Sequence, residues 1–306
     1  MNLLVNGIKL EVEDSASTYP SHLQRPVLLL IMGLGLQLIE WPQALLQELQ
    51  DAGYRVIRFD NRDSGLSSAL DHLGKPKLTW SLLRFQMGLE LHPGYTLADM
   101  AADALALLDA LGIERAHVLG LSMGGMVAQR MAIAAPQRVL SLTSVMSSSG
   151  AKGLPGPAPH VLKAMMQRPG GDDEASVVAH TLQVLQAIAS PAYPTPPEQM
   201  RQHISQAYQR SYRPLGIKRQ MLAVMADSAR AALLAQISSP TLVLHGRADP
   251  LVPFACAEDT ARRIPGATLL GIEGLGHDLP VQGVQRMLGA LLPHLLAAQL
   301  RTATSV

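Results

Sequence analysis

Ser122 lies between two glycines, at a point where a strand is expected to give way to a helix. Residues 117–121 (HVLGL) are typical of a buried strand, and residues 123–130 (MGGMVAQR) are compatible with a helix. Gly120, Ser122 and Gly124 therefore form a G-x-S-x-G motif at a strand-to-helix turn. Such a turn strains the serine backbone and exposes its hydroxyl group beside helix N–H groups. We interpret Ser122 as a candidate nucleophile, although a Gly-Ser turn without chemistry has the same pattern.

A serine nucleophile needs a histidine to accept its proton and a carboxylate to orient that histidine. Of the ten histidines, His277 stands out because it lies in the glycine-flanked segment EGLGHDLP, between the last predicted strand and the last predicted helix. His245 ends another predicted strand, and we interpret it as structural. Asp249 follows that strand in HGRADPLVP, where an aspartate before a proline is also a common turn-former. The chain order Ser122, Asp249, His277 differs from that of both unrelated serine-protease families.

The negative oxygen that forms during nucleophilic attack needs hydrogen-bond donors. One predicted donor is the backbone N–H of Met123, the residue after the nucleophile. The other should come from a loop after an earlier strand, and residues 30–35 (LIMGLG) fit that loop. We assign the second donor to the N–H of Leu34, with Gly33 as the less favoured choice. A glycine-rich turn without any such role would have a similar sequence.

Alternating strands and helices are expected to position these residues. An Asn6-Gly7 pair predicts an N-terminal hairpin, and Thr96 with Asp99 predicts a capped helix start. A mostly parallel sheet with helices on both faces, an α/β fold, accounts for this alternation most simply. The predicted strands after the hairpin are residues 26–32, 54–60, 116–122, 138–146, 240–246 and 267–274, and the predicted helices are residues 41–53, 96–112, 123–136, 254–265 and 281–299.

The alternation breaks at about Ser147, where SSSGAKGLPGPAP begins. Up to about Ala229 the sequence reads as helices broken by prolines, without a buried-strand pattern. We therefore predict a first core segment at residues 1–146, a helical cap at residues 147–228 and a second core segment at residues 229–306. A cap over the carboxyl ends of the strands would shape a pocket and limit the entry of water.

Composition excludes several other classes of protein. With 306 residues, 48% hydrophobic and 16% charged, the chain is expected to be globular. A net charge of +1 without a long basic run argues against nucleic acid, and a single cysteine, Cys256, argues against disulfides or a metal cluster. We expect no metal and no cofactor. Neither a signal peptide nor a membrane span is predicted, so we expect a cytoplasmic protein that does not bind membranes, and a homodimer stays open.

Several segments together resemble the α/β-hydrolases that carry a helical cap, over nearly the whole chain. Within that superfamily the chain is most similar to esterases of the aclacinomycin-methylesterase kind, in which MG likewise replaces the commoner HG of the oxyanion loop. The resemblance implies an α/β-hydrolase fold and a serine nucleophile, unlike the haloalkane dehalogenases and epoxide hydrolases, which use aspartate. It also implies a structural role for Arg62 and Asp63. The segments are MGLG (residues 32–35), FDNRDSGLS (59–67), GLSMGG (120–125), HGRADPLVP (245–253) and GLGHDLP (274–280).

The predicted reaction is hydrolysis of a small, moderately apolar carboxylic ester through a Ser-His-Asp triad. The same triad can also transfer acyl groups to alcohols or peroxide, hydrolyse carbon–carbon bonds or release an N-terminal proline, and a non-catalytic receptor for small molecules is a further alternative. The acidic run at residues 172–174 could hold an α-amine, but it is more typical of a helix start. The candidate pocket residues are Met32, Trp41, Phe85, Met87, Met126 and Met146. Methionines at such positions are more often simple core residues.

Overall fold

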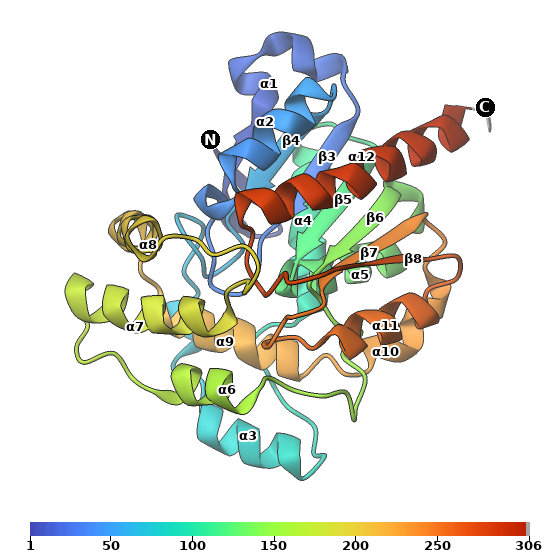
Figure 1. Cartoon of the computed structure of the whole chain (residues 1–306). Coiled ribbons are helices and arrows are strands. Elements are labelled where there is room, and N and C mark those ends of the chain that lie inside the picture. Colours follow the sequence, from blue (N-terminus) through green and yellow to red (C-terminus); the bar gives the residue numbers. More distant parts are fainter. Residues whose placement is uncertain (304–306) are drawn as a thin grey trace.

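An eight-stranded sheet forms the centre of the protein (Figure 1). The computed structural model describes residues 1–303. The strand order is β1-β2-β4-β3-β5-β6-β7-β8; the β1–β2 and β2–β4 pairs are antiparallel and the pairs from β4 to β8 are parallel. The predicted mostly parallel sheet is thus confirmed. The strands are β1 (Asn2–Val5), β2 (Ile8–Asp14), β3 (Val27–Ile31), β4 (Arg55–Phe59), β5 (Ala116–Leu121), β6 (Val139–Val145), β7 (Thr241–Gly246) and β8 (Thr268–Ile272).

Helices cover both faces of this sheet, as predicted. The α-helices are α1 (Ser15–Thr18), α2 (Gln43–Asp51), α3 (Leu78–Gln86), α4 (Leu97–Ala110), α5 (Met123–Ala134), α6 (Pro159–Met166), α7 (Glu174–Ile188), α8 (Pro197–Arg210), α9 (Pro214–Met225), α10 (Arg230–Leu233), α11 (Phe254–Arg263) and α12 (Val281–Ala303). Short 3-10 helices are η1 (Pro20–Gln24), η2 (Leu38–Glu40), η3 (Asp71–Leu73), η4 (Pro136–Arg138) and η5 (Leu234–Gln236).

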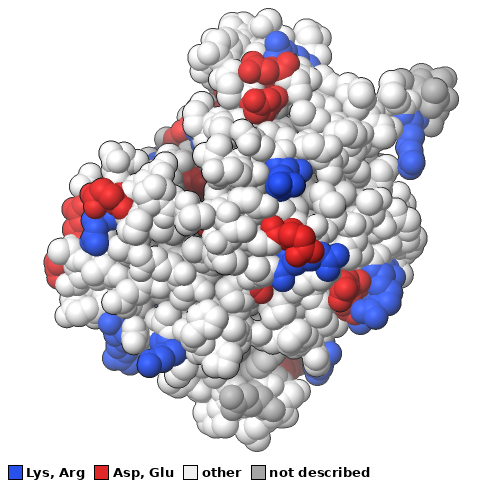
Figure 2. Space-filling model, in the orientation of Figure 1, with Lys and Arg blue, Asp and Glu red and all other residues white. Residues whose placement is uncertain are grey.

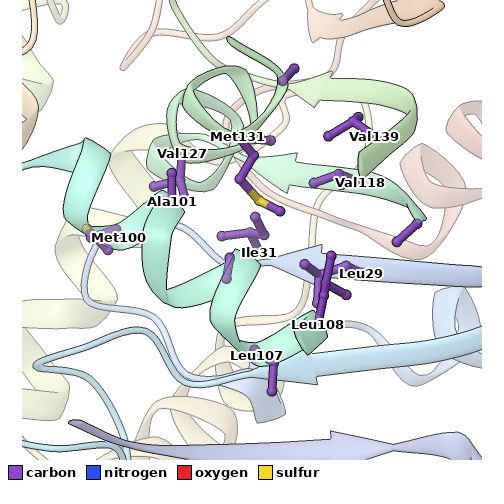
Figure 3. Close-up of a cluster of buried hydrophobic side chains, with 14 of the residues drawn as sticks. Leu29, Ile31, Met100, Ala101, Leu107, Leu108, Val118, Val127, Met131 and Val139 are labelled. Atoms are coloured by element: carbon purple, nitrogen blue, oxygen red, sulfur yellow. The ribbon is translucent and has the colours of Figure 1, made fainter. Parts of the chain in front are cut away.

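Strand β3 shows how the core is divided between the two faces. Leu29 and Ile31 pack with side chains of α4 and α5 (Figure 3), whereas Leu28 and Leu30 belong to the apolar cluster formed with α2 and α12. All four side chains are fully buried. Because side chains alternate between the faces of a sheet, a strand covered on both faces must be apolar throughout, which is why its sequence shows no polar alternation.

Local signals in the sequence also formed as expected. Asn6 and Gly7 have φ values of 48° and 77° in a two-residue turn, and Val5 pairs with Ile8 across it. At the start of α4, the Thr96 hydroxyl accepts a hydrogen bond from the Asp99 N–H, and the Asp99 carboxylate accepts one from the Thr96 N–H. These contacts satisfy helix N–H groups that otherwise lack a partner.

Helices α6, α7, α8 and α9 lie between β6 and β7 in the chain, and Figure 1 shows them grouped at one side of the molecule. We call residues 147–228 the insertion; its exact limits stay a prediction. The structure also shows that α3, in the segment predicted to belong to the core, contacts α9. The first core segment therefore contributes a helix that packs against the insertion.

A buried polar cluster joins the two ends of the insertion to the core. The fully buried Arg230 guanidinium donates to the Asp227 carboxylate at 2.7 Å, to the Ser148 carbonyl at 3.0 Å and to Gln129 of α5. Arg130 of α5 also pairs with Asp227. Removing Asp227 would leave the buried Arg230 charge without its carboxylate partner, so this ion pair helps to hold the end of the insertion against the core.

Charged side chains on the face drawn in Figure 2 form small groups, several of which mix both signs. This pattern agrees with a net charge of +1 and leaves the drawn face without an extended basic area. In the part of the chain that the structure describes, none of the helices has the length and apolar character that crossing a bilayer requires.

Candidate active site

Ser122 occupies the turn between β5 and α5 in a strained backbone conformation, with φ 54° and ψ −116°. The flanking glycines make this turn sterically feasible. A Cβ atom at Gly120 would lie 2.1 Å from the Gly124 carbonyl oxygen, and one at Gly124 would lie 2.0 Å from the Ile31 carbonyl oxygen. Positive φ at a residue other than glycine costs about 1–3 kcal/mol and persists only where the surroundings enforce it. Here the close packing of α5 against β3 and β5 enforces it.

The structure brings Ser122, His277 and Asp249 together from the ends of three different strands. The Ser122 Oγ atom lies 3.1 Å from His277 Nε2, and His277 Nδ1 lies 2.7 Å from Asp249 Oδ2. An ionised carboxylate can only accept, so Nδ1 carries the proton and Nε2 presents its lone pair to the serine hydroxyl. Asp249 is buried, whereas Ser122 is partly exposed. The carboxylate is therefore shielded from solvent, whereas part of Ser122 is accessible to it.

The Asp249 carboxylate is held on both oxygens. Its Oδ1 accepts hydrogen bonds from the N–H groups of Leu251 and Val252 at 2.9 and 2.8 Å. Burial alone would raise the pKa of Asp249, but His277 and His245 outweigh burial and lower that pKa to about 2. The carboxylate is thus charged at neutral pH and able to stabilise a protonated His277.

His245, which we interpreted from the sequence as structural, touches this carboxylate and not the serine. Its Nε2 lies 2.7 Å from the Val252 carbonyl oxygen and 3.2 Å from Asp249 Oδ2. A carbonyl oxygen only accepts, so Nε2 carries a proton that also faces the carboxylate. His245 therefore contacts the same Asp249 oxygen as His277, a contact that its position at a strand end did not reveal.

The loop that carries His277 is attached to the insertion. The His277 N–H donates to the Ile188 carbonyl at 2.8 Å, and the Gly276 N–H donates to the Ser190 hydroxyl at 2.8 Å. Ser190 in turn hydrogen-bonds the Asp278 carboxylate through both its N–H and its hydroxyl group. A Cβ atom at Gly276 would lie 2.5 Å from the Ile188 carbonyl oxygen, so the two segments are in backbone contact. Ser190 was missed from the sequence because nothing in its neighbourhood marks it.

The loop at residues 32–36 lies beside the serine turn. A Cβ atom at Gly33 would lie 3.5 Å from the Ser122 Cβ atom. The Leu36 N–H closes a turn onto the Gly33 carbonyl, and the Gly35 N–H donates to Gln220 of α9. Within residues 1–303, the N–H groups of Gly33, Leu34 and Met123 donate no hydrogen bond to another protein group. Met123 and Leu34 therefore stay the predicted oxyanion donors, with Gly33 as the alternative.

The candidate pocket residues fall into two groups. Met32, Trp41 and Met146 are buried in the cluster on the α2 and α12 side, and Met126 is buried in the cluster on the opposite face. Phe85 is 48% and Met87 63% exposed, and neither belongs to these two clusters, so their place in a pocket stays a prediction. Phe85 lies on α3 and Met87 follows it, and α3 has no buried residue among its described side chains. Apolar residue type alone had suggested a pocket wall.

Comparison with known proteins agrees with the observed fold. A family model described as the alpha/beta hydrolase fold matches residues 26–284. The chain belongs to this family. It is 31% identical over 291 residues to rhodomycin D methylesterase DauP of Streptomyces sp. (strain C5), covering 89% of this chain and 91% of the relative. It is 30% identical over 291 residues, with the same coverage, to rhodomycin D methylesterase DnrP of Streptomyces peucetius.

A crystal structure of a hydrolase from Pseudomonas aeruginosa PA01 superposes with a TM-score of 0.68 at 27% identity, covering 96% of this chain and 97% of that chain. Family membership and the methylesterase relatives identify the protein as a hydrolase that acts on ester bonds. The predicted α/β-hydrolase fold, and the resemblance to esterases of the aclacinomycin-methylesterase kind, are confirmed.

Proposed function

We propose that the protein is a serine esterase that hydrolyses a small, uncharged, moderately apolar carboxylic ester through a Ser122-His277-Asp249 triad. The observation that carries this proposal is the continuous hydrogen-bonded series from Ser122 Oγ through His277 to Asp249, beside backbone N–H groups without a protein acceptor. Because the two Streptomyces relatives are methylesterases, methyl esters are the first substrates to test.

In the first half-reaction, Ser122 Oγ attacks the ester carbonyl carbon while His277 Nε2 takes the hydroxyl proton. Asp249 holds the imidazole by its Nδ1–H and stabilises its charged form. The carbonyl oxygen becomes negative and accepts hydrogen bonds from the N–H groups of Met123 and Leu34, each worth about 3 kcal/mol in the transition state. The C–O bond to the alcohol then breaks, and the proton on His277 goes to the leaving oxygen.

In the second half-reaction, water attacks the acyl-enzyme while His277 accepts one of its protons. The tetrahedral intermediate collapses, the proton returns to Ser122 Oγ, and the carboxylic acid leaves. Every proton transfer uses the same imidazole nitrogen, Nε2. The protein's own groups thus account for each step.

The test compares wild type with Ser122→Ala and Asp249→Asn on a series of methyl esters that differ in acyl length and polarity. We expect Ser122→Ala to lower kcat by at least about 10⁴-fold, and Asp249→Asn by about 10³–10⁴-fold because the imidazole loses its orienting carboxylate. A fluorescent phosphonate should label wild type at one site, identified as Ser122 by peptide mapping. A Ser122→Ala enzyme whose kcat stays within about tenfold of wild type would overturn the proposal, as would labelling at another residue.

A further inference from the structure

Helix α9 of the insertion packs directly against the loop that holds the predicted oxyanion donor. A Cβ atom at Gly35 would lie 2.8 Å from Cγ1 of Ile217, and one at Gly216 would lie 2.1 Å from the Asp63 carbonyl oxygen. The buried Arg219 guanidinium binds the Asp63 carboxylate at 2.7 Å. One surface of α9 thus touches both the loop at residues 32–36 and the loop after β4.

Gln220 is the polar residue of α9 that reaches the predicted oxyanion loop. Its side chain is fully buried. Its Oε1 accepts a hydrogen bond from the Gly35 N–H at 2.7 Å, and its Nε2 donates to the Arg62 carbonyl at 2.8 Å. The orientation of the amide is unambiguous, since a backbone N–H can only donate and a backbone carbonyl can only accept. Gln220 therefore links two core loops through a single side chain.

Two further contacts hold the same loop, and both come from the segment after β4. Asn61 donates to the Met32 carbonyl at 3.0 Å, and the Ser64 hydroxyl donates to the Leu36 carbonyl at 2.7 Å. With Gly35 held by Gln220, the loop is fixed on both sides of residues 33 and 34. The N–H groups left between these fixed points are those proposed to bind the oxyanion.

We propose that Gln220 is a positioning residue that fixes the oxyanion loop from the insertion, an inference that rests on the proposed esterase function. A donor must already lie at the place where negative charge develops, because its benefit depends on not having to reorganise during the reaction. The contact at Gly35 fixes the peptide plane between Leu34 and Gly35, which adjoins the plane that carries the Leu34 N–H, and so limits the directions that this N–H can take. In this view α9 forms part of the catalytic framework and does not act only as a lid.

The main test is Gln220→Met, which nearly preserves side-chain volume and removes both hydrogen bonds. Active sites are titrated with the phosphonate so that kcat refers to folded enzyme. We expect kcat to fall about 10- to 100-fold while KM changes less than about threefold, because the ground state makes little use of the oxyanion donors. Affinity for a trifluoromethyl ketone, which forms a tetrahedral adduct with Ser122, should fall by the same factor as kcat/KM.

The matched control is Gln129→Met on α5. Gln129 is also a fully buried glutamine with two side-chain partners, Ser144 and Arg230, but it does not contact residues 32–36. We expect this variant to lower the urea midpoint of unfolding while leaving kcat per titrated site, and trifluoromethyl-ketone affinity, within about twofold of wild type. If Gln220 served only general stability, both variants would change these quantities alike.

Gln220→Glu supplies a second test that does not require the methionine variant to fold. A protonated glutamate has a carbonyl that can accept from the Gly35 N–H and a hydroxyl that can donate to the Arg62 carbonyl, whereas the ionised form repels that carbonyl. The ratio of kcat/KM in this variant to that of wild type should therefore rise as pH falls from about 8 to 5.5. Taking the ratio cancels the loss of activity that both enzymes share in acid.

The outcomes separate the two proposals. A Ser122→Ala enzyme whose kcat stays within about tenfold of wild type would refute the esterase mechanism and, with it, the role of Gln220. An inactive Ser122→Ala, together with a Gln220→Met enzyme whose kcat stays within twofold of wild type, would refute only the positioning role. If Gln220→Met does not fold, a pH-independent ratio in Gln220→Glu refutes the positioning role in the same way.

Discussion

The turn of the candidate nucleophile Ser122 and the two loops around it are held by different sets of contacts. The Ser122 turn is fixed within the core, where Gly120 and Gly124 bring α5 into backbone contact with β3 and β5. The His277 loop and the loop at residues 32–36 also receive contacts from the insertion, through Ser190 and Gln220 respectively. The insertion is therefore a structural support of the candidate site in addition to its expected role as a lid.

The two kinds of support also differ in strength. A Cβ atom that would lie about 2 Å from a carbonyl oxygen cannot be accommodated without moving the main chain, because both elements are parts of the close-packed core. A lost side-chain hydrogen bond costs about 1–3 kcal/mol and leaves the surrounding packing in place. Changes at the serine turn should therefore affect folding, whereas changes at the insertion contacts should affect catalysis more than folding.

The largest effect is expected for Gly124→Ala. Its Cβ atom would lie 2.0 Å from the Ile31 carbonyl oxygen, so the free energy of unfolding should fall by about 3 kcal/mol or more and activity should be lost with it. Urea unfolding and ester turnover measure both effects. The control is Gly289→Ala in α12, where a Cβ atom meets nothing within 4 Å and the variant should be up to about 1 kcal/mol more stable. A Gly124→Ala protein of wild-type stability would contradict the steric account.

Ser190→Ala should have a smaller effect, and it should reduce catalysis more than stability. The Gly276 N–H and the Asp278 carboxylate each lose a partner, so the His277 loop should be less well positioned and kcat/KM should fall about tenfold. The free energy of unfolding should fall by only about 1–2 kcal/mol. Steady-state kinetics and urea unfolding on the same preparations separate the two.

Ser205→Ala is the control for that variant, since the Ser205 hydroxyl binds Glu174 within the insertion, away from the candidate site. Its kcat/KM should equal that of wild type. If both serine variants lost activity to the same extent, the effect would come from a loosened insertion in general and not from the contact with the His277 loop.

The smallest effect concerns the loss of stability in acid, and it involves His117 on β5, the strand that leads to Ser122. His117 is fully buried near the start of β5. Burial, together with the nearby His294, lowers the pKa of His117 to about 4. An unfolded histidine titrates near 6.5, so the unfolded state binds more protons between these values and the free energy of unfolding falls as pH decreases. We expect a loss of about 1–2 kcal/mol between pH 7 and 5 from this residue.

Urea unfolding of wild type and His117→Gln at pH 7 and 5 measures the contribution of His117, and the variant should lose less stability in acid.

The Asp249 carboxylate behaves differently. Its lowered pKa of about 2 contributes stability above the unfolded pKa, near 4, and that stability is lost only as pH falls from there toward 2. Acid should therefore weaken the core strand before it neutralises the carboxylate that orients His277. An identical pH dependence in the two proteins would contradict the assignment to His117.

Several features of the fold and of the candidate site could be predicted from the sequence. The alternation of strands and helices predicted the sheet, and the two-residue hairpin and the α4 capping box were both correct. Ser122, Asp249 and His277 were predicted from short motifs at strand ends, and the structure places His277 within hydrogen-bond distance of both Ser122 and Asp249. The exposure of Phe85 and Met87 could not be predicted, because an apolar side chain does not by itself indicate which surface covers it.

The sequence alone determined those features whose cause is local. Such features act over a few residues, so their effect can be predicted from a short segment. Examples are the glycines two positions on either side of Ser122, the two-residue turn, the capping pair and the apolar runs of strand length. The supports of the candidate site could not be read in this way. Gln220 lies 185 residues from its partner Gly35, and Ser190 lies 86 residues from Gly276. Only tertiary structure decides which of the many polar side chains in the insertion meet these loops, because that depends on how separate elements pack.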